Sequence, residues 1–228
     1  MCGAPRVMEG RNSPSHSNEK SGRRFRKRDC VLGDLYRATG KNAEAVGLLD
    51  KALPQLQKQA EKEPKNPAAR KLFLNILASR AQALYSMGRS ADALRDWDQI
   101  DAAMKGQMSP SWRGQRAQAL AQAGQHGRAC SEAEALAKQF PRSIETLYDA
   151  ACVFSVASAT AAKDDKLGEE ERKMLAEKYA DRAVALLKDA IGKGYKDADH
   201  MKKDTDPDPL RARDDFKELL RSLEKPDP

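Results

Sequence analysis

Two stretches decide the fold: RAQALYSMGRSADALRDWDQID at residues 80–101 and RAQALAQAGQHGRACSEAEALA at residues 116–137. They align without gaps around a glycine, and LGDLYRATGKNAEAVGLLDKAL at residues 32–53 aligns with both of them. The shared glycine is Gly40, Gly88 or Gly124. On each side of it, apolar residues recur at helical spacing. The sequence therefore contains related units, each predicting two helices joined by a tight turn, in which the glycine supplies the left-handed residue that ends the first helix.

The positions around the turn glycine carry residue types that suit close helix packing. A small residue stands seven positions before the glycine, and an alanine stands five positions after it. These are Gly33, Ala81 and Ala117, and then Ala45, Ala93 and Ala129. Nine positions after the glycine, Leu49 and Trp97 are large enough to fill the gap to the next helix pair, whereas Ala133 is not. We expect thin helices at short separations, in keeping with 36 alanines and a low aromatic content of 5%.

The predicted helix starts rest on capping residues. Asn42 and Ser90, two positions after the glycine, are expected to cap the second helix of their units, with His126 a weaker cap. Asn66–Pro67 and Ser109–Pro110 place a capping side chain before a proline in the first turn of a helix.

These patterns predict an all-α chain with no strand signal. Residues 29–194 would form about four helix pairs, followed by a capping segment at 195–228. The four pairs are placed at residues 29–65, 66–108, 109–142 and 143–194. In the last segment, a helix beginning at Asp208–Pro209 would carry one apolar stripe, formed by Phe216, Leu219, Leu220 and Leu223.

Charge is concentrated at the N-terminus. The chain has a net charge of +7, of which residues 1–28 contribute +6 and the remaining residues +1. Residues 1–28 are too polar to bury apolar surface, so we expect a disordered basic tail. Its basic cluster consists of Arg23, Arg24, Arg26, Lys27 and Arg28. Such a cluster can contact the phosphates of RNA or DNA, or an anionic lipid surface. The alternatives are a solvated tail without a ligand, or sequence that lies upstream of the true start codon.

Other function classes find little support in the sequence. The longest uncharged stretch, 150–162, has 13 residues and is too short to cross a membrane. The four cysteines form neither a CxxC pair nor a compact framework, which favours a reducing, cytoplasmic setting. Asp204, Asp206 and Asp208 match the opening of a calcium loop, but Pro209 replaces its required glycine, so turn and capping roles are expected instead. We find no catalytic motif, metal cluster or cofactor motif, and therefore expect a chain that is not an enzyme.

The repeated pattern resembles the tetratricopeptide repeat, with its small inner residues, an alanine in the second helix and a closing proline such as Pro141. The resemblance implies a right-handed solenoid of antiparallel helix pairs. Residues 145–223 are also similar to the tetratricopeptide tails that follow the catalytic domain in a group of bacterial serine/threonine kinases. That similarity implies a recruiting or regulatory module, because the motifs of a kinase domain are absent from this sequence.

The resemblance also implies a peptide-binding groove on the first helices of the pairs. The family's groove positions correspond here to Asn75, Gln82, Tyr85, Ser86, Gln115, Gln118, Gln122 and Asp149. Amide side chains can pair with both the N–H and the C=O groups of an extended peptide. The family's clamp for a terminal carboxylate is not matched, since Ala78 and Gly114 stand where a cation would be expected. These amides are either a peptide-binding surface or a solvated inner face.

Two hypotheses about function follow. The first is a non-enzymatic scaffold that binds an unidentified protein or peptide in the groove, as a detached regulatory tail of a serine/threonine kinase system would. The alternative is a nucleic-acid-associated protein anchored by the basic tail alone, because the rest of the chain has no basic stripe. The sequence does not indicate an oligomeric state.

Overall fold

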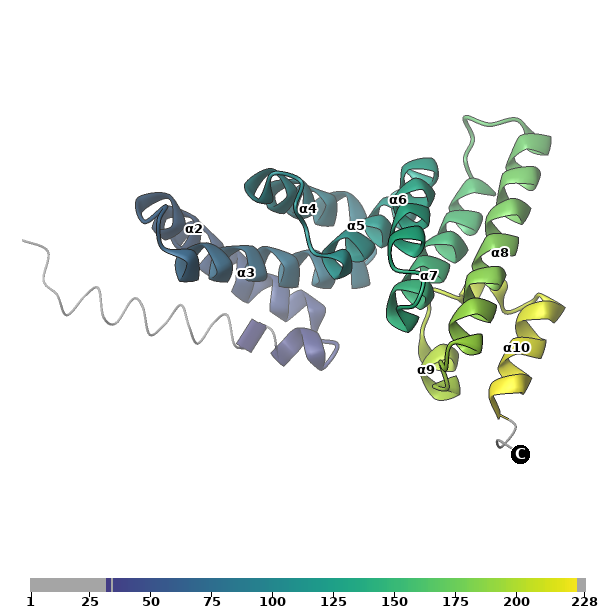
Figure 1. Cartoon of the computed structure of the whole chain (residues 1–228). Helices are drawn as coiled ribbons and strands as arrows, with labels where there is room; N and C mark the ends of the chain where they lie inside the picture. Colours follow the sequence, from purple (N-terminus) through teal and green to yellow (C-terminus); the bar gives the residue numbers. More distant parts are fainter. Residues whose placement is uncertain (1–31, 34, 225–228) are drawn as a thin grey trace, which may run out of the picture.

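A computed structural model describes residues 32, 33 and 35–224 of the chain, and within them it contains helices and no strand (Figure 1). The predicted basic tail, with its cluster at Arg23, Arg24, Arg26, Lys27 and Arg28, lies outside the described residues. The helices are α2 (Asn42–Lys62), α3 (Pro67–Ser86), α4 (Ser90–Met104), α5 (Pro110–Gln122), α6 (His126–Gln139), α7 (Ile144–Ala161), α8 (Glu169–Gly192), α9 (Ala198–Lys203), a 3-10 turn η1 (Asp208–Leu210) and α10 (Asp214–Glu224).

Each helix from α2 to α8 packs against the next one along the chain, as Figure 1 shows. In addition, α5 packs against both α3 and α7, so these three helices form one layer of the molecule. We call the surface of this layer, which carries Tyr85, Gln118 and Tyr148, the α3–α5–α7 face. All-helical architecture is therefore confirmed, and consecutive helices are neighbours in space.

The turn glycines have the backbone conformation that the sequence predicts. Gly40, Gly88 and Gly124 have φ angles of 76°, 73° and 77°, which L-residues rarely adopt. The alanines five positions after them are fully buried, at 0% exposure. A Cβ atom on Gly33 would lie only 2.7 Å from Leu49 Cδ2, so an alanine there would force the buried side chain of Leu49 to shift.

Trp97 joins one helix pair to the next. Its side chain on α4 is 1% exposed, and its ring centroid lies 6.4 Å from that of Trp112 on α5. The prediction that this position fills the gap to the next pair is confirmed. At the corresponding position of the next unit, Ala133 is also fully buried, but it lines a pocket of about 450 Å³.

The predicted helix caps divide into two groups. The side chain of Asn66 accepts hydrogen bonds from the N–H groups of Ala68 and Ala69, and Ser109 Oγ accepts one from the N–H of Trp112, as expected. The caps predicted at Asn42 and Ser90 are wrong: both are the first residues of their helices, and the preceding residues make no side-chain cap. Ser90 is buried and its hydroxyl donates instead to the amide oxygen of Gln122 on α5.

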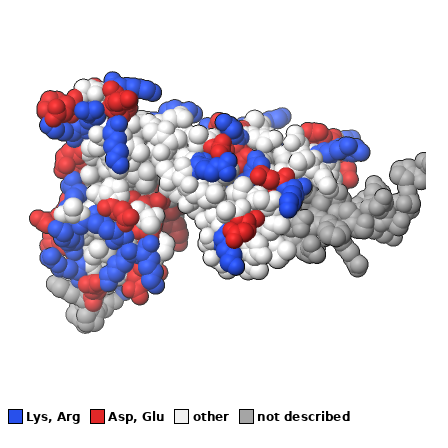
Figure 2. Space-filling view, turned by 180° about the vertical axis from the view of Figure 1, so that it is seen from behind, with Lys and Arg blue, Asp and Glu red and all other residues white. Residues whose placement is uncertain are grey.

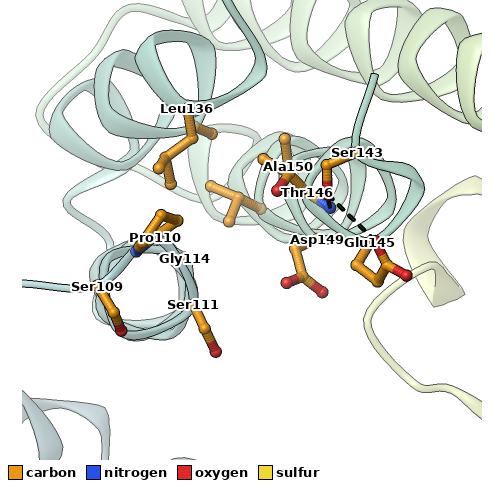
Figure 3. Close-up of a pocket in the computed structure, with 12 residues that line it drawn as sticks. Ser109, Pro110, Ser111, Gly114, Leu136, Ser143, Glu145, Thr146, Asp149 and Ala150 are labelled. Carbon is orange, nitrogen blue, oxygen red and sulfur yellow. Dashed lines mark hydrogen bonds between the residues drawn. The ribbon is translucent and has the colours of Figure 1, made fainter. Parts of the chain in front are cut away.

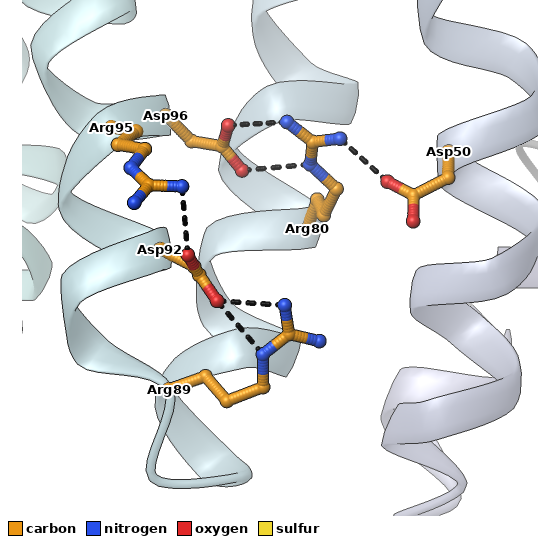
Figure 4. A network of polar contacts seen from close by, with 6 residues as sticks. All are labelled: Asp50, Arg80, Arg89, Asp92, Arg95 and Asp96. Atoms are coloured by element: carbon orange, nitrogen blue, oxygen red, sulfur yellow. Dashed lines mark hydrogen bonds and ion pairs between the residues drawn. The ribbon is translucent and has the colours of Figure 1, made fainter.

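A polar network ties α2, α3 and α4 together (Figure 4). Arg80 of α3 donates from Nε and Nη2 to the carboxylate of Asp96 on α4, at 2.9 and 2.6 Å, and from Nη1 to Asp50 of α2 at 2.5 Å. The side chain of Asp96 is only 3% exposed, whereas that of Asp50 is 52% exposed. Arg80 is therefore the partner that allows a buried carboxylate between the helices.

The C-terminal segment does more than close the end of the stack. The capping helix begins at Asp214 and not at Asp208–Pro209, where the chain makes a short 3-10 turn. The apolar stripe packs as predicted, since Phe216 and Leu219 are buried and α10 contacts α8 and α9. Between α9 and α10 the chain returns to α7, which η1 contacts directly. None of the helices in the described part is long and apolar enough to cross a membrane.

Candidate functional site

The predicted groove residues lie on the three helices of one layer. Asn75, Gln82, Tyr85 and Ser86 are on α3, Gln115, Gln118 and Gln122 on α5, and Asp149 on α7. The amides of Gln82 and Gln115 meet across the two helices, with Gln82 Nε2 donating to Gln115 Oε1 at 2.6 Å. Gln122 points instead to Ser90, and Asn75 is exposed. The structure thus brings only some of these residues together.

The α3–α5–α7 face holds a short non-helical segment of the chain itself, between α9 and η1. Tyr85 Oη of α3 donates to Asp206 Oδ1 at 2.7 Å, and Gln118 Nε2 of α5 donates to Asp206 Oδ2 at 3.2 Å. Tyr148 Oη of α7 donates to Asp204 Oδ2 at 2.9 Å. Side chains from all three helices therefore bind the two aspartates of one short segment.

The ends of this segment are firmly anchored. Met201 and Leu210 are both fully buried, at 0% exposure, and Pro207 is buried between them. Arg211 Nη2 donates to the carbonyl oxygens of Lys202 and Asp204, at 2.9 and 2.7 Å. The segment is thus an integral part of the fold: the face binds its aspartate side chains, and Arg211 binds two of its backbone carbonyl groups.

Sequence reasoning missed part of the roles of Asp204 and Asp206, and the role of Tyr148. The predicted turn role of Asp204 is confirmed, since its Oδ1 accepts a hydrogen bond from the N–H of Asp206 at 3.0 Å. The sequence did not predict that Asp204 and Asp206 also accept hydrogen bonds from the α3–α5–α7 face. Nothing in the sequence identifies the surface that receives them, since Tyr85 precedes Asp206 by 121 residues.

Several carboxylates lie close together on this face, and Asp149, Asp204 and Asp206 form no ion pair with any Lys or Arg that the structure describes. Burial raises the pKa of Asp149 to about 6, and the neighbouring Asp204 and Glu145 raise it further, while His200 lowers it. Burial also raises the pKa of Asp206 to about 6, with Asp204, Asp149 and Asp208 adding to the shift and the hydrogen bond from Tyr85 opposing it. Protonation of these two carboxyls is therefore coupled to the packing of the segment.

A pocket of about 450 Å³ opens beside these carboxylates, between the start of α5, α6 and the first half of α7 (Figure 3). In Figure 3, Asp149 and Ser111 project toward the same side of the helix pair. The lining residues are Ser109, Pro110, Ser111, Gly114, Ala133, Leu136, Ser143, Glu145, Thr146, Asp149, Ala150 and Val153. Its floor is apolar, its rim is acidic or hydroxylic, and it carries no Lys or Arg.

In the part of the chain that the structure describes, we find no group of side chains arranged as a catalytic site. No group of three or more His, Cys, Asp or Glu residues there could hold a metal ion. Burial raises the pKa of Cys130 to about 12, so its thiol is protonated near neutral pH and is a poor nucleophile. His126, expected as a weak cap, instead hydrogen-bonds Asp164 at 3.1 Å and lies 3.5 Å from Tyr179 Oη.

The surface charge pattern also bears on function. Figure 2 shows a broad area without charged side chains in the middle of that view, while Lys, Arg, Asp and Glu are crowded and interspersed on the C-terminal part of the molecule. No single-sign basic stripe appears on this view, so a nucleic-acid interface on this side is not favoured.

Comparison with known proteins gives no relative: no family model matches the chain, and no curated protein is significantly similar to it.

Proposed function

We propose that this chain is a right-handed solenoid of about four tetratricopeptide-like helix pairs with a C-terminal capping helix, and that it is a non-enzymatic protein–protein interaction scaffold. Its ligand is an extended segment of another protein, bound on the concave α3–α5–α7 face. The turn glycines with positive φ and the fully buried alanines after them support the repeat assignment.

One observation supports the proposed activity: this face already holds a short non-helical segment of the chain by its aspartate side chains. Hydroxyl and amide groups from α3, α5 and α7 donate to Asp204 and Asp206. Beyond that stretch, the same face offers the paired amides of Gln82 and Gln115, exposed Asn75, and the pocket beside Asp149. Amide side chains such as these can pair with both the N–H and the C=O groups of a peptide.

Residues 145–223 are similar to the tetratricopeptide tails that follow bacterial serine/threonine kinase domains. A serine/threonine kinase system is therefore the first source of partners to test. In such a system, the chain would act as a separate recruiting module and not as the catalyst.

The test is an affinity capture from the source cell's lysate in which the face is blocked by bulky charged residues. Asn75→Arg and Ser86→Arg change exposed positions of α3, and Ser131→Arg changes an exposed position of α6 as the matched control. All proteins are used as full chains with and without nuclease, and captured proteins are identified by mass spectrometry.

We expect the wild type and Ser131→Arg to retain the same protein after nuclease treatment, and the two α3 variants to lose it. A protein captured equally by all the variants would place binding elsewhere. Loss on nuclease treatment would favour the alternative in which the basic N-terminal cluster anchors a nucleic acid.

A further inference from the structure

Asp149 is a partly buried carboxylate of α7 that lacks a compensating partner among the described residues. It receives no hydrogen bond and no ion pair from the residues that the structure describes. The groups that face it are two further carboxylates, Asp204 and Glu145, and the imidazole of His200. A buried carboxylate without donors is costly, and proteins normally pair it. Asp149 therefore stands out from Asp96, which has a bidentate arginine, and from Asp206, which has two donors.

The pocket beside Asp149 is kept open by a glycine within a helix. Gly114 lies inside α5, where alanine would stabilise the helix more. A Cβ atom at this position would be 3.8 Å from Asp149 Oδ2 and 4.0 Å from its Cβ, which is ordinary contact. Close packing therefore does not demand glycine here. Its missing side chain leaves space directly in front of the carboxylate.

The pocket has two chemically different parts. Its floor is formed by apolar groups from three helices, among them Pro110, Leu136 and Val153. Its rim carries Asp149, Glu145 and the hydroxyl of Ser111. A side chain with an apolar stem and a cationic end matches both parts, because lysine and arginine lay their methylene groups on apolar surface and keep the charge at a polar boundary.

We propose that this pocket binds the lysine or arginine side chain of an extended, basic segment of a partner protein. The inference rests on the proposed function and specifies the partner's chemistry. The stem packs on the floor and the cation donates to Asp149, which then has the counter-charge that the described residues do not supply. Charge decides against an acidic partner, because Asp149, Glu145, Asp204 and Asp206 would all repel it.

The pH dependence of binding follows from the same group. Burial raises the pKa of Asp149 to about 6, so a cationic ligand meets a neutral carboxyl at pH 5 and a carboxylate at pH 7.5. Affinity for a lysine peptide should therefore rise over this range. The charged and titratable groups that face Asp149 are Asp204 and Glu145, which also attract a cation, and the imidazole of His200, which opposes them.

The experiment begins with an array of nine-residue peptides whose flanking positions are degenerate and whose central residue is fixed as Lys, Arg, norleucine or Glu. The full-length protein is the probe. The strongest lysine peptide is then made with a fluorescein label, together with its norleucine twin, and dissociation constants are measured by fluorescence anisotropy at pH 5.0 and 7.5. Norleucine keeps the stem and removes only the charge.

Three variants are compared with the wild type. Asp149→Asn removes the charge, Gly114→Ala narrows the pocket while favouring the helix, and Glu170→Gln removes a charge from a side chain of α8 that is 91% exposed. We expect the lysine peptide to bind about tenfold or more tightly than its norleucine twin at pH 7.5, as a charge-assisted hydrogen bond allows. Asp149→Asn should abolish that preference, Gly114→Ala should weaken binding of both peptides, and Glu170→Gln should change neither.

The outcomes separate the two levels of the proposal. Equal binding of the lysine and norleucine peptides, or a lysine preference that survives Asp149→Asn, would overturn the cation pocket and leave the peptide-binding face standing. If no peptide of any class binds, the proposed function itself fails. If an unlabelled peptide of residues 20–31 of this chain competes as strongly as the selected peptide, the occupant is the chain's own basic segment, and the assignment to a partner protein is overturned.

Discussion

Replacing Arg80 by methionine tests whether the network of Figure 4 holds the first helices together. Arg80 gives two hydrogen bonds to Asp96 and one to Asp50, so Arg80→Met removes all three while keeping an apolar side chain in the same space. The two acids differ in environment, with 3% of the Asp96 side chain exposed and 52% of the Asp50 side chain. The consequence should fall almost entirely on Asp96.

The expected loss follows from that burial. Removing one partner of a buried ion pair leaves an uncompensated charge and costs about 3–5 kcal/mol of unfolding free energy. Breaking a solvent-exposed pair costs less than about 1 kcal/mol, so Asp50→Asn is the matched control. Replacing both partners by apolar residues is often neutral, so Arg80→Met combined with Asp96→Leu should recover most of the loss.

The loss should also depend on pH. Burial raises the pKa of Asp96, and the hydrogen bonds from Arg80 oppose that shift. Without Arg80, only burial and the nearby acids remain, so the pKa in the folded state moves further above its unfolded value. At low pH, Asp96 is then neutral in the folded protein and its burial costs little. As the pH rises through the folded pKa, Asp96 ionises and the loss of unfolding free energy grows.

The assay is urea unfolding of each full-length protein, followed by circular dichroism at 222 nm at pH 5 and pH 7.5. We expect Arg80→Met to lose several times more stability than Asp50→Asn at pH 7.5, and less at pH 5. If Arg80→Met matches Asp50→Asn within the fitting error, Arg80 does not compensate a buried charge. If the double variant is no more stable than Arg80→Met, the loss comes from packing and not from Asp96.

Three further predictions concern the buried side chain of Trp97, the hydrogen bond from Tyr85 to Asp206, and the charge of Asp149. Trp97→Ala should cost about 3–5 kcal/mol, because it removes a fully buried indole between helix pairs, and an unchanged melting curve would refute this role. Tyr85→Phe should cost about 1–3 kcal/mol in urea unfolding at neutral pH by removing a donor to Asp206, and equal stability would show that the hydroxyl is not needed. Asp149→Asn should be more stable than the wild type by about 1–3 kcal/mol above pH 7 and equal to it below pH 4, since a raised folded pKa gives stability that is lost as the pH rises through about 6. Parallel stability curves over this range would contradict that assignment.

The helix pairs could be predicted because their determinants are local. A glycine with positive φ, an alanine five residues later and apolar residues at helical spacing act within about twenty residues of one another. The Asn66 and Ser109 caps are of the same kind, since each side chain bonds the backbone two or three residues ahead. Helix content and the buried positions could therefore be read from the chain.

The caps that failed show where local reasoning stops. Ser90 is a good N-cap by residue type, yet its hydroxyl is buried and donates to Gln122, 32 residues away. The helix begins at Ser90 itself, one residue earlier than a cap at Ser90 would require. Packing against the next helix pair gives the Ser90 hydroxyl a different acceptor, Gln122. Neighbouring repeats thus override a preference that is sound for an isolated helix.

The sequence by itself determined that the chain is helical, where its turns lie, and which face of each helix is buried, because side-chain size and backbone propensity act over short distances. Only the tertiary structure decided that residues 204–206 cross the α3–α5–α7 face, that Tyr85 and Tyr148 bind them, and that Asp149 is left beside a pocket without a counter-charge. These features depend on contacts between residues 56 to 121 positions apart. Their energies are fixed by burial and by the charges that burial brings together, and neither quantity exists until the helices have packed.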